Sequence, residues 1–134
     1  MLTDPWILMR LVVAAVLGAL IGFERKSVHK PAGVRTHMLV SLGSALFILV
    51  TLTILKDEAP KIIPGIATGI GFLGAGTIFR AKDNVKGLTT AASIWTVAAI
   101  GLTVGFGEYI LAGISTILVI VILELKKLDF VREV

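Results

Sequence analysis

Cysteine is absent from the 134-residue chain, charged residues make up only 16% of it and aromatic residues only 7%. The lack of cysteine excludes disulfide bonds and thiolate metal sites. Scarce charge stands beside 56% hydrophobic residues and a mean hydropathy of +0.96. An ordinary soluble domain is excluded, because a chain this short could not bury so much apolar surface in water. We therefore expect a membrane protein in contact with the lipid bilayer.

Long apolar segments predict the fold class. A charge-free run of about 18 residues matches the length of helix that crosses a bilayer's hydrocarbon core. Five apolar segments, free of charge except for Arg10 in the first, predict an all-α membrane protein with transmembrane helices over residues 6–23, 38–55, 62–79, 88–106 and 109–123. No linker interrupts them, so we expect one five-helix domain over residues 1–134. The first segment lacks a basic leader and a cleavage pattern, so we expect it to be kept as a span.

The basic residues predict the topology. Four Lys and Arg residues lie between the first two segments, three between the third and fourth, and three after the fifth, whereas the opposite side carries two. The positive-inside rule then predicts an N-terminus outside and a cytoplasmic C-terminus. The pI of about 9.7 thus reflects topology, and we expect no nucleic-acid partner. A basic membrane surface would also attract anionic lipid headgroups.

The third segment is rich in glycine. Its glycines fall on two opposite helix faces, which predicts close packing of neighbouring helices on both sides and a central position in the bundle. Its GIGFLG run matches a dinucleotide fingerprint but lies inside one apolar segment without a preceding strand, which argues against a nucleotide site. As an alternative, Pro64 and the glycines unwind the helix and expose carbonyls to an ion. The packing glycines are Gly65, Gly69, Gly71, Gly74 and Gly76.

Hydroxyl residues recur at helical spacing in the second and fourth segments. One interpretation is hydrogen bonding between helices or back to their own carbonyls. The other is a polar path or cation site between the two helices, because Mg²⁺ prefers oxygen ligands. The absence of a carboxylate from both stripes favours the first interpretation. The stripes are His37, Ser41, Ser44 and Thr51, and Thr89, Ser93, Thr96 and Thr103.

Two charged side chains stand out near the membrane. Arg10 lies within a span, where it either serves an ion path or extends its side chain to the interface. Glu24 closes the first segment, where we expect an ion pair with Arg35 or Arg80, or a role in a substrate path. No Ser/His/Asp arrangement, phosphate loop or paired carboxylate indicates an enzyme.

Four motifs in order resemble the MgtC/SapB family: LGALIGFER (17 to 25), AGVRTHMLVSLG (32 to 43), GIGFLGAGTIF (69 to 79) and KGLTTAASIWTVAAIGLTVGFGEY (86 to 109). The resemblance implies a five-span protein of the prokaryotic plasma (inner) membrane. Family members are associated with growth at low magnesium and, in pathogens, with survival inside host cells. Many continue into a cytoplasmic domain resembling an ACT fold, so we expect no sensing through such a domain within these 134 residues.

The resemblance also marks individual positions. Relatives tend to show an arginine and then a glutamine before the glycine helix, where this sequence has Lys61 and no amide, so any role of that glutamine does not transfer. The family-like polar residues are Arg10, Glu24, Arg25, Arg35, Thr36, His37, Thr89, Thr90 and Ser93. The family-like glycines are Gly33, Gly69, Gly71, Gly74, Gly76 and Gly87.

Two functional hypotheses follow. The first is a factor in magnesium or ion homeostasis that carries Mg²⁺ or another cation, with no resident cofactor and an unassigned metal site. Its path would use Arg10, Glu24, His37, Ser41, Ser44, Thr89, Ser93 and Thr96. The second is a non-transporting module that binds another membrane protein or anionic lipid through cytoplasmic contacts at Arg25, Arg35, Thr36, Arg80, Lys86 and Thr90. Under either hypothesis we expect a homo-oligomer, which the glycine faces could join.

Overall fold

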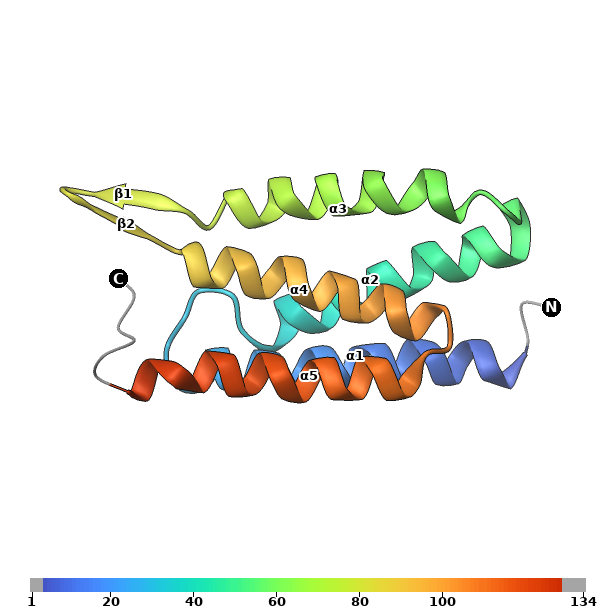
Figure 1. The fold of residues 1–134 in the computed structure, drawn as a ribbon, viewed down its shortest axis with the longest axis horizontal. Helices are drawn as coiled ribbons and strands as arrows, with labels where there is room; N and C mark the ends of the chain where they lie inside the picture. The colour runs from blue at the N-terminus through green and yellow to red at the C-terminus, as the bar shows by residue number, and fades with distance from the viewer. Residues whose placement is uncertain (1–3, 129–134) are drawn as a thin grey trace.

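The computed structural model describes residues 4–128, which form five α-helices running lengthwise (Figure 1). The helices are α1 (Pro5–Ser27), α2 (Val34–Val50), α3 (Ala59–Ala75), α4 (Leu88–Gly105) and α5 (Tyr109–Glu124). A π-helical turn, η1 (Thr51–Leu55), extends α2, and a 3-10 turn, η2 (Leu125–Lys127), extends α5. The strands β1 (Phe79–Ala81) and β2 (Asn84–Lys86) form a hairpin between α3 and α4.

The helical fold class predicted from hydropathy is confirmed. Four helices, namely α1, α2 with η1, α4, and α5 with η2, are long and apolar enough to cross a membrane. The apolar helix α3 has only 17 residues, so the fifth span stays a prediction, as does the direction of the chain across the bilayer.

Local signals in the sequence account for where the helices begin. At α1, the Asp4 side chain accepts a hydrogen bond from the Trp6 backbone N–H at 3.1 Å, and Pro5 occupies the first helical position. Pro60 likewise stands in the first turn of α3, where its missing N–H costs nothing. Gly87 precedes α4 with a φ of +90°, a conformation that favours glycine.

The third predicted segment, residues 62–79, is displaced along the chain. The helix begins three residues earlier and ends at Ala75, where the Thr77 hydroxyl donates to the Gly74 carbonyl at 2.7 Å. Phe79 then pairs with Lys86 across the antiparallel hairpin. The run RAKDNVKG after Phe79 is polar, so the sequence predicts only a loop between the third and fourth segments.

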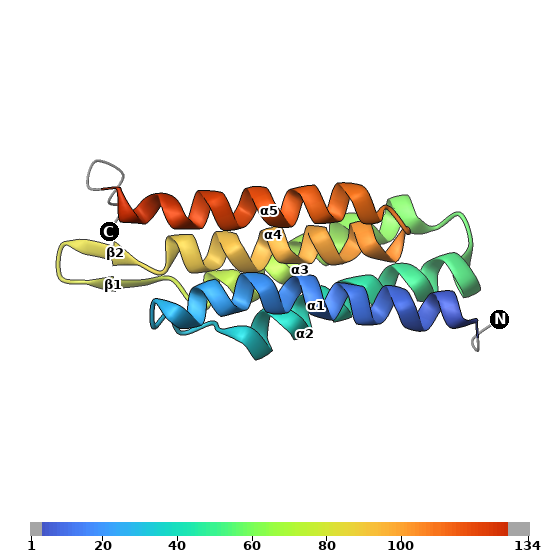
Figure 2. The same ribbon diagram turned by 90° about the horizontal axis from the view of Figure 1, so that it is seen from below.

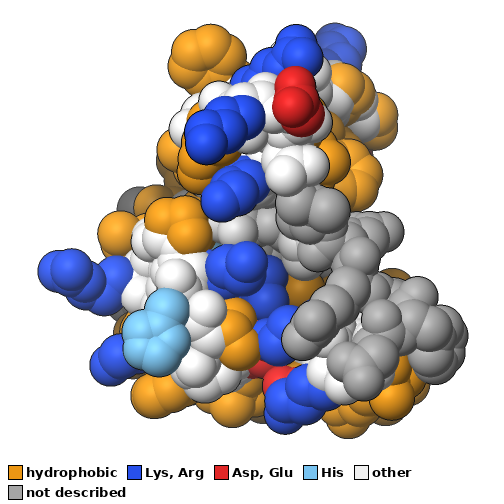
Figure 3. All heavy atoms as spheres, turned by 90° about the vertical axis from the view of Figure 1, so that its left-hand side faces the viewer, with side chains coloured by type: hydrophobic (Ala, Val, Ile, Leu, Met, Phe, Trp, Pro, Cys, Tyr) orange, Lys and Arg blue, Asp and Glu red, His pale blue; other side chains and the backbone are white. Residues whose placement is uncertain are grey.

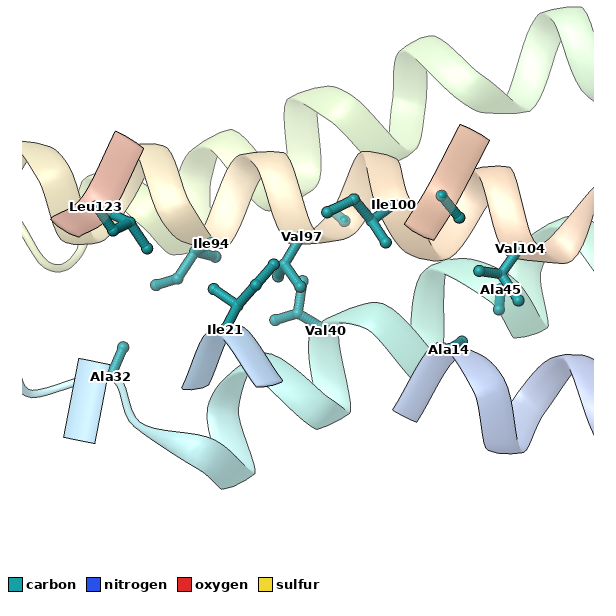
Figure 4. Close-up of a cluster of buried hydrophobic side chains, with 12 residues drawn as sticks. Ala14, Ile21, Ala32, Val40, Ala45, Ile94, Val97, Ile100, Val104 and Leu123 are labelled. Carbon is teal, nitrogen blue, oxygen red and sulfur yellow. The ribbon is translucent and has the colours of Figure 1, made fainter. Parts of the chain in front are cut away.

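The core lies where α1, α2 and α4 meet (Figure 4). Ile21 of α1, Val40 of α2, and Ile94 and Val97 of α4 point toward one another there, and each is at least nine-tenths buried. The helix α4 contacts all four other helices. It therefore occupies the central position that the sequence predicted for the glycine-rich helix.

Glycines on α1 and α4 make the closest helix contacts. A Cβ at Gly18 would lie 2.5 Å from the His37 carbonyl oxygen, and one at Gly22 would lie 2.5 Å from the Val34 Cα. A Cβ at Gly101 of α4 would collide with the carbonyl oxygen of Ser41. These contacts hold α2 between α1 and α4 at backbone-to-backbone distance.

Within a single chain, only one of the five glycines predicted for close packing in the third segment meets another helix. Gly65, Gly69 and Gly71 have no atom within 4 Å of an added Cβ, and the nearest to Gly76 belongs to Leu73 of its own helix. Only at Gly74 does another helix come close, through the Ala91 carbonyl at 3.2 Å. The physical reason is that α3 lies at the edge of the bundle and packs mainly on α4 (Figure 1).

Alternation of the helices places the basic regions at one end. The loop between α1 and α2, the hairpin and η2 lie together there, opposite the described N-terminal end (Figures 1 and 2). We call this the basic end. Several lysine and arginine side chains are spread over the face seen in Figure 3.

Candidate functional site

A hydrogen-bonded cluster joins α2 to α4. The His37 ring contacts the Gly33 carbonyl through Nδ1 at 2.9 Å and the Ser93 hydroxyl through Nε2 at 3.0 Å. The Ser93 hydroxyl lies 2.8 Å from the Thr90 carbonyl. His37, Ser93 and Thr90 are all almost completely buried. The structure thus brings together two residues of the predicted path, one from each hydroxyl stripe.

The proton count of this cluster restricts its chemistry. The Gly33 carbonyl only accepts, so His37 Nδ1 donates to it. In neutral imidazole Nε2 then accepts the Ser93 proton, and that proton has a competing acceptor in the Thr90 carbonyl. Both ring nitrogens already have oxygen partners, so the His37 side chain links α2 to α4 and has no free nitrogen for a cation.

The serines further along α2, Ser41 and Ser44, lie outside this cluster. Ser41 and Ser44 are buried, and neither hydroxyl has a hydrogen-bond partner within the described part of the chain. The Ser41 backbone lies directly against Gly101, which leaves no room beside it for a side chain. Two buried hydroxyls thus remain without a hydrogen-bond partner in the described part of the chain, an arrangement that costs stability.

The stripe predicted on the fourth segment does not form one buried face. Thr96 and Thr103 bond back to carbonyls of their own helix, at Ala92 and Ala99, both at 2.8 Å. Thr89 is exposed and lies at the basic end. The reason is rotation of α4, because Ser93 is at the edge of this stripe and the core side of the helix carries Thr90, Ile94 and Val97 instead.

Arg10 lies at the opposite end of the bundle from the basic end. Its Nη1 donates to the Gly105 carbonyl at 2.9 Å, and its guanidinium packs against Gly107 in the turn after α4. Fourteen residues of α1 separate it from Glu24, a rise of about 21 Å. Arg10 is therefore not part of one continuous site with Glu24.

A buried ion cluster closes the basic end. The Glu24 carboxylate accepts from Arg25 Nε at 2.7 Å and Nη2 at 3.3 Å, and it also pairs with Lys126 of η2. Only 1% of the Arg25 side chain and 5% of the Glu24 side chain are exposed. The predicted pairing of Glu24 with Arg35 or Arg80 is wrong, because α5 returns to this end and its extension supplies a nearer cation.

A cavity of about 460 Å³ opens beside this cluster. The first turn of α4 and the end of α5 form its walls, and four basic side chains line it. The residues around it are Arg25, Lys30, Lys86, Gly87, Thr89, Thr90, Ile122, Leu123, Leu125 and Lys126. The site therefore combines a cationic lining with one apolar wall from α5.

The residues predicted to form cytoplasmic contacts divide into two groups. Arg35, Arg80 and Lys86 are exposed at the basic end, as a contact surface requires, and Thr36 is half-buried. Arg80 donates to the Lys82 carbonyl at 3.2 Å across the hairpin turn. Arg25 and Thr90, in contrast, are buried, and both line the cavity instead of the outer surface.

No grouping that suits a metal ion occurs within residues 4–128, where three or more His, Asp or Glu side chains nowhere come together. The one carboxylate proposed for a cation path, Glu24, is already paired with two cations. The basic end therefore favours anions electrostatically.

Sequence analysis missed two residues of this end, Lys30 and Lys126. Lys126 meets Glu24 from 102 positions away, and no local pattern reports such a contact. The available signal was topological, since helices one and five both end on the side where the positive-inside count is high.

Comparisons with known proteins agree with the sequence motifs. A model of the MgtC family matches residues 11–129. "Protein MgtC" of Salmonella typhimurium (strain LT2) is 47% identical over 120 residues, which is 90% of this chain and 52% of that protein. "Protein MgtC" of Brucella abortus is 44% identical over 110 residues, 81% of this chain and 46% of that protein.

A further relative carries a functional name. "Putative magnesium transporter YhiD" of Escherichia coli (strain K12) is 40% identical over 126 residues, 87% of this chain and 59% of that protein. The chain thus spans about half the length of the curated relatives it matches. No solved structure matches it.

Proposed function

This chain belongs to the MgtC family, and we propose that it is a non-transporting module of magnesium or ion homeostasis that acts on another membrane protein through its basic end. We place it in a bacterial plasma membrane with that end in the cytoplasm. The exposed contacts are Arg35, Arg80 and Lys86, which stand on the α1–α2 side and on the hairpin.

The pairing of Glu24 carries this proposal. A Mg²⁺ path uses oxygen ligands and generally includes one or two carboxylates. Glu24 is the carboxylate predicted for the path, and Arg25 and Lys126 already neutralise it. Releasing it to bind a passing cation would leave two buried or half-buried positive charges behind, which is costly.

A cation transporter is the second candidate. Ser41 and Ser44 favour it, because buried hydroxyls without a partner are free to coordinate an ion between α2 and α4. One relative also carries the name "Putative magnesium transporter YhiD". Close packing of Gly101 on the Ser41 backbone counts against a hydrated passage there.

Mg²⁺ flux into liposomes that contain the purified, folded protein separates the two candidates. We expect no flux above that of empty liposomes. Flux that disappears in Ser41→Ala/Ser44→Ala would instead establish transport along the α2–α4 interface and end the non-transporting proposal.

Growth at low magnesium tests the basic surface, in a bacterium that lacks its own copy of this gene. We expect the unchanged chain to restore growth and Arg35→Gln/Arg80→Gln not to restore it, when both proteins are present in the membrane in equal amounts. The control Lys56→Gln/Lys61→Gln makes the same charge change at the opposite end, and we expect it to restore growth fully. Equal loss in both variants would contradict a contact surface at the basic end.

A further inference from the structure

The cavity at the basic end contains a buried cation with an unused donor. Arg25 lines the cavity, and its Nε and Nη2 are fixed by Glu24 at 2.7 and 3.3 Å. Its Nη1 is buried and has no hydrogen-bond partner among residues 4–128. A buried N–H group of a charged side chain is costly when left unpaired, so this position calls for an acceptor.

The first turn of α4 points to the same space. Gly87 is the N-cap of this 18-residue helix and provides no side-chain hydrogen bond, and Gly87, Thr89 and Thr90 all line the cavity. The first N–H groups of a helix have no partners inside the helix and carry a partial positive charge. Backbone N–H groups of this kind bind phosphate and other oxyanions.

Glycine is required at this corner for reasons of space. Gly87 has a φ of +90°, and a Cβ there would collide with the Thr77 carbonyl oxygen. The Thr77 hydroxyl in turn contacts the Gly74 carbonyl at 2.7 Å, so the corner is tied to the end of α3. The open helix start is thus held in place by its surroundings.

The remaining charges complete a cationic lining. Lys30, Lys86 and Lys126 join Arg25 around the cavity, and Glu24 is the carboxylate bonded to this set, through Arg25 and Lys126. Four cations against one carboxylate leave an excess of positive charge that an anion would balance. A guanidinium fork with lysines and helix N–H groups is chemistry suited to phosphate oxygens.

We propose that this cavity is a binding site for a phosphate group, supplied either by free phosphate or by the headgroup of an anionic phospholipid. Arg25 Nη1 and the first N–H groups of α4 bind the phosphate oxygens, and Lys30 and Lys86 neutralise the remaining charge from the rim. Ile122 of α5 and Leu125 of η2 offer apolar surface to the lipid in the second case. The site goes beyond the proposed function and does not depend on whether the protein transports a cation.

The test is binding by the purified chain in a maltoside detergent, which contains no phosphate. Inorganic phosphate is titrated in one arm by calorimetry, and phosphatidylglycerol in the other by native mass spectrometry. We expect saturable binding of at least one probe. Binding of phosphate alone identifies a free anion as the ligand, and binding of phosphatidylglycerol alone identifies a lipid headgroup.

Paired variants decide whether the cavity is responsible. Lys30→Gln and Lys86→Gln remove lining charges without touching the buried pair, and we expect each to weaken binding about tenfold. Lys26→Gln and Lys82→Gln remove the same charge from exposed positions outside the lining, and we expect unchanged binding. Absence of saturable binding for both probes, or equal weakening in all four variants, would overturn the proposal.

Discussion

The Nε2 atom of His37 on α2 lies 3.0 Å from the Oγ atom of Ser93 on α4, and this contact joins the two helices in their buried interior. Ser93 also lies 2.8 Å from the Thr90 carbonyl of its own helix. A single hydroxyl therefore connects the histidine ring to the α4 backbone. Because this contact lies in the core, we assign it a structural role. Thr96 and Thr103 of the same stripe donate hydrogen bonds to carbonyls of their own helix.

Removing the Ser93 hydroxyl tests that assignment. Ser93→Ala leaves His37 Nε2 buried without a partner, so we expect the free energy of unfolding to fall by about 0.6 to 1.7 kcal/mol, the range for such bonds in membrane helices. Unfolding in a detergent titration measures the change. Thr96→Ala is the control, because its hydroxyl bonds only to the Ala92 carbonyl of its own helix, and a loss as large as that of Ser93→Ala would contradict the role of the His37 contact.

Close approach of α2 and α4 at Gly101 gives a second prediction. A methyl group at Gly101 collides with the Ser41 carbonyl oxygen, so Gly101→Ala must push the helices apart. We expect a loss of about 1 to 3 kcal/mol in the free energy of unfolding, as for overpacked cores. Gly113→Ala on α5 makes the same chemical change where the added methyl group has no neighbouring atom within 4 Å, and we expect no loss in the free energy of unfolding. Equal stability of the two variants would show that the contact can relax.

The glycines show what sequence could and could not establish. Hydropathy placed the ends of α1, α4 and α5 within a few residues, because lipid demands long apolar helices. It also singled out a glycine-rich helix, but glycine spacing says only that a face is small, not which neighbour fills it. The close contacts lie at Gly18, Gly22 and Gly101, and the pairs Gly18/Gly22 and Gly101/Gly105 have the G-x-x-x-G spacing of closely packed membrane helices, a local signal that counting glycines per segment overlooks.

The grouping of basic residues at one end of the bundle was predictable in part from the sequence. Counting charges predicted which regions share a side of the membrane, and the structure places these regions at one end. It could not predict that Glu24 pairs with Lys126 or that Arg25 is buried, because those contacts depend on how α5 packs against α1. Ion pairs between residues far apart in the sequence can be identified only from the fold, whereas the net charge of each loop can be counted from the sequence alone.

The open face of α3 predicts self-association. A Cβ added at Gly65 or Gly69 would have no neighbouring atom within 4 Å. Both glycines line an apolar groove of about 480 Å³ between α2 and α3. Small faces of this kind let helices of separate chains approach closely in lipid. The chain has no cysteine, so Gly69→Cys would supply its single thiol, and we expect a disulfide-linked dimer on oxidation in membranes. Gly113→Cys is equally open, and equal dimer yields from both would show random collision instead of a specific face.

Arg10 separates a structural role from a role in an ion path. Its Nη1 donates to the Gly105 carbonyl, one of the last in α4, where a cation also interacts favourably with the helix dipole. We expect Arg10→Met to lower the free energy of unfolding by about 1 to 3 kcal/mol, because a charged hydrogen bond is lost. Arg10→Lys keeps the charge but not the fork that packs on Gly107, so we expect an intermediate loss. Thermal unfolding in detergent measures both. Full stability of Arg10→Met would mean that the bond to Gly105 contributes nothing to the fold, and the arginine would then need a functional explanation.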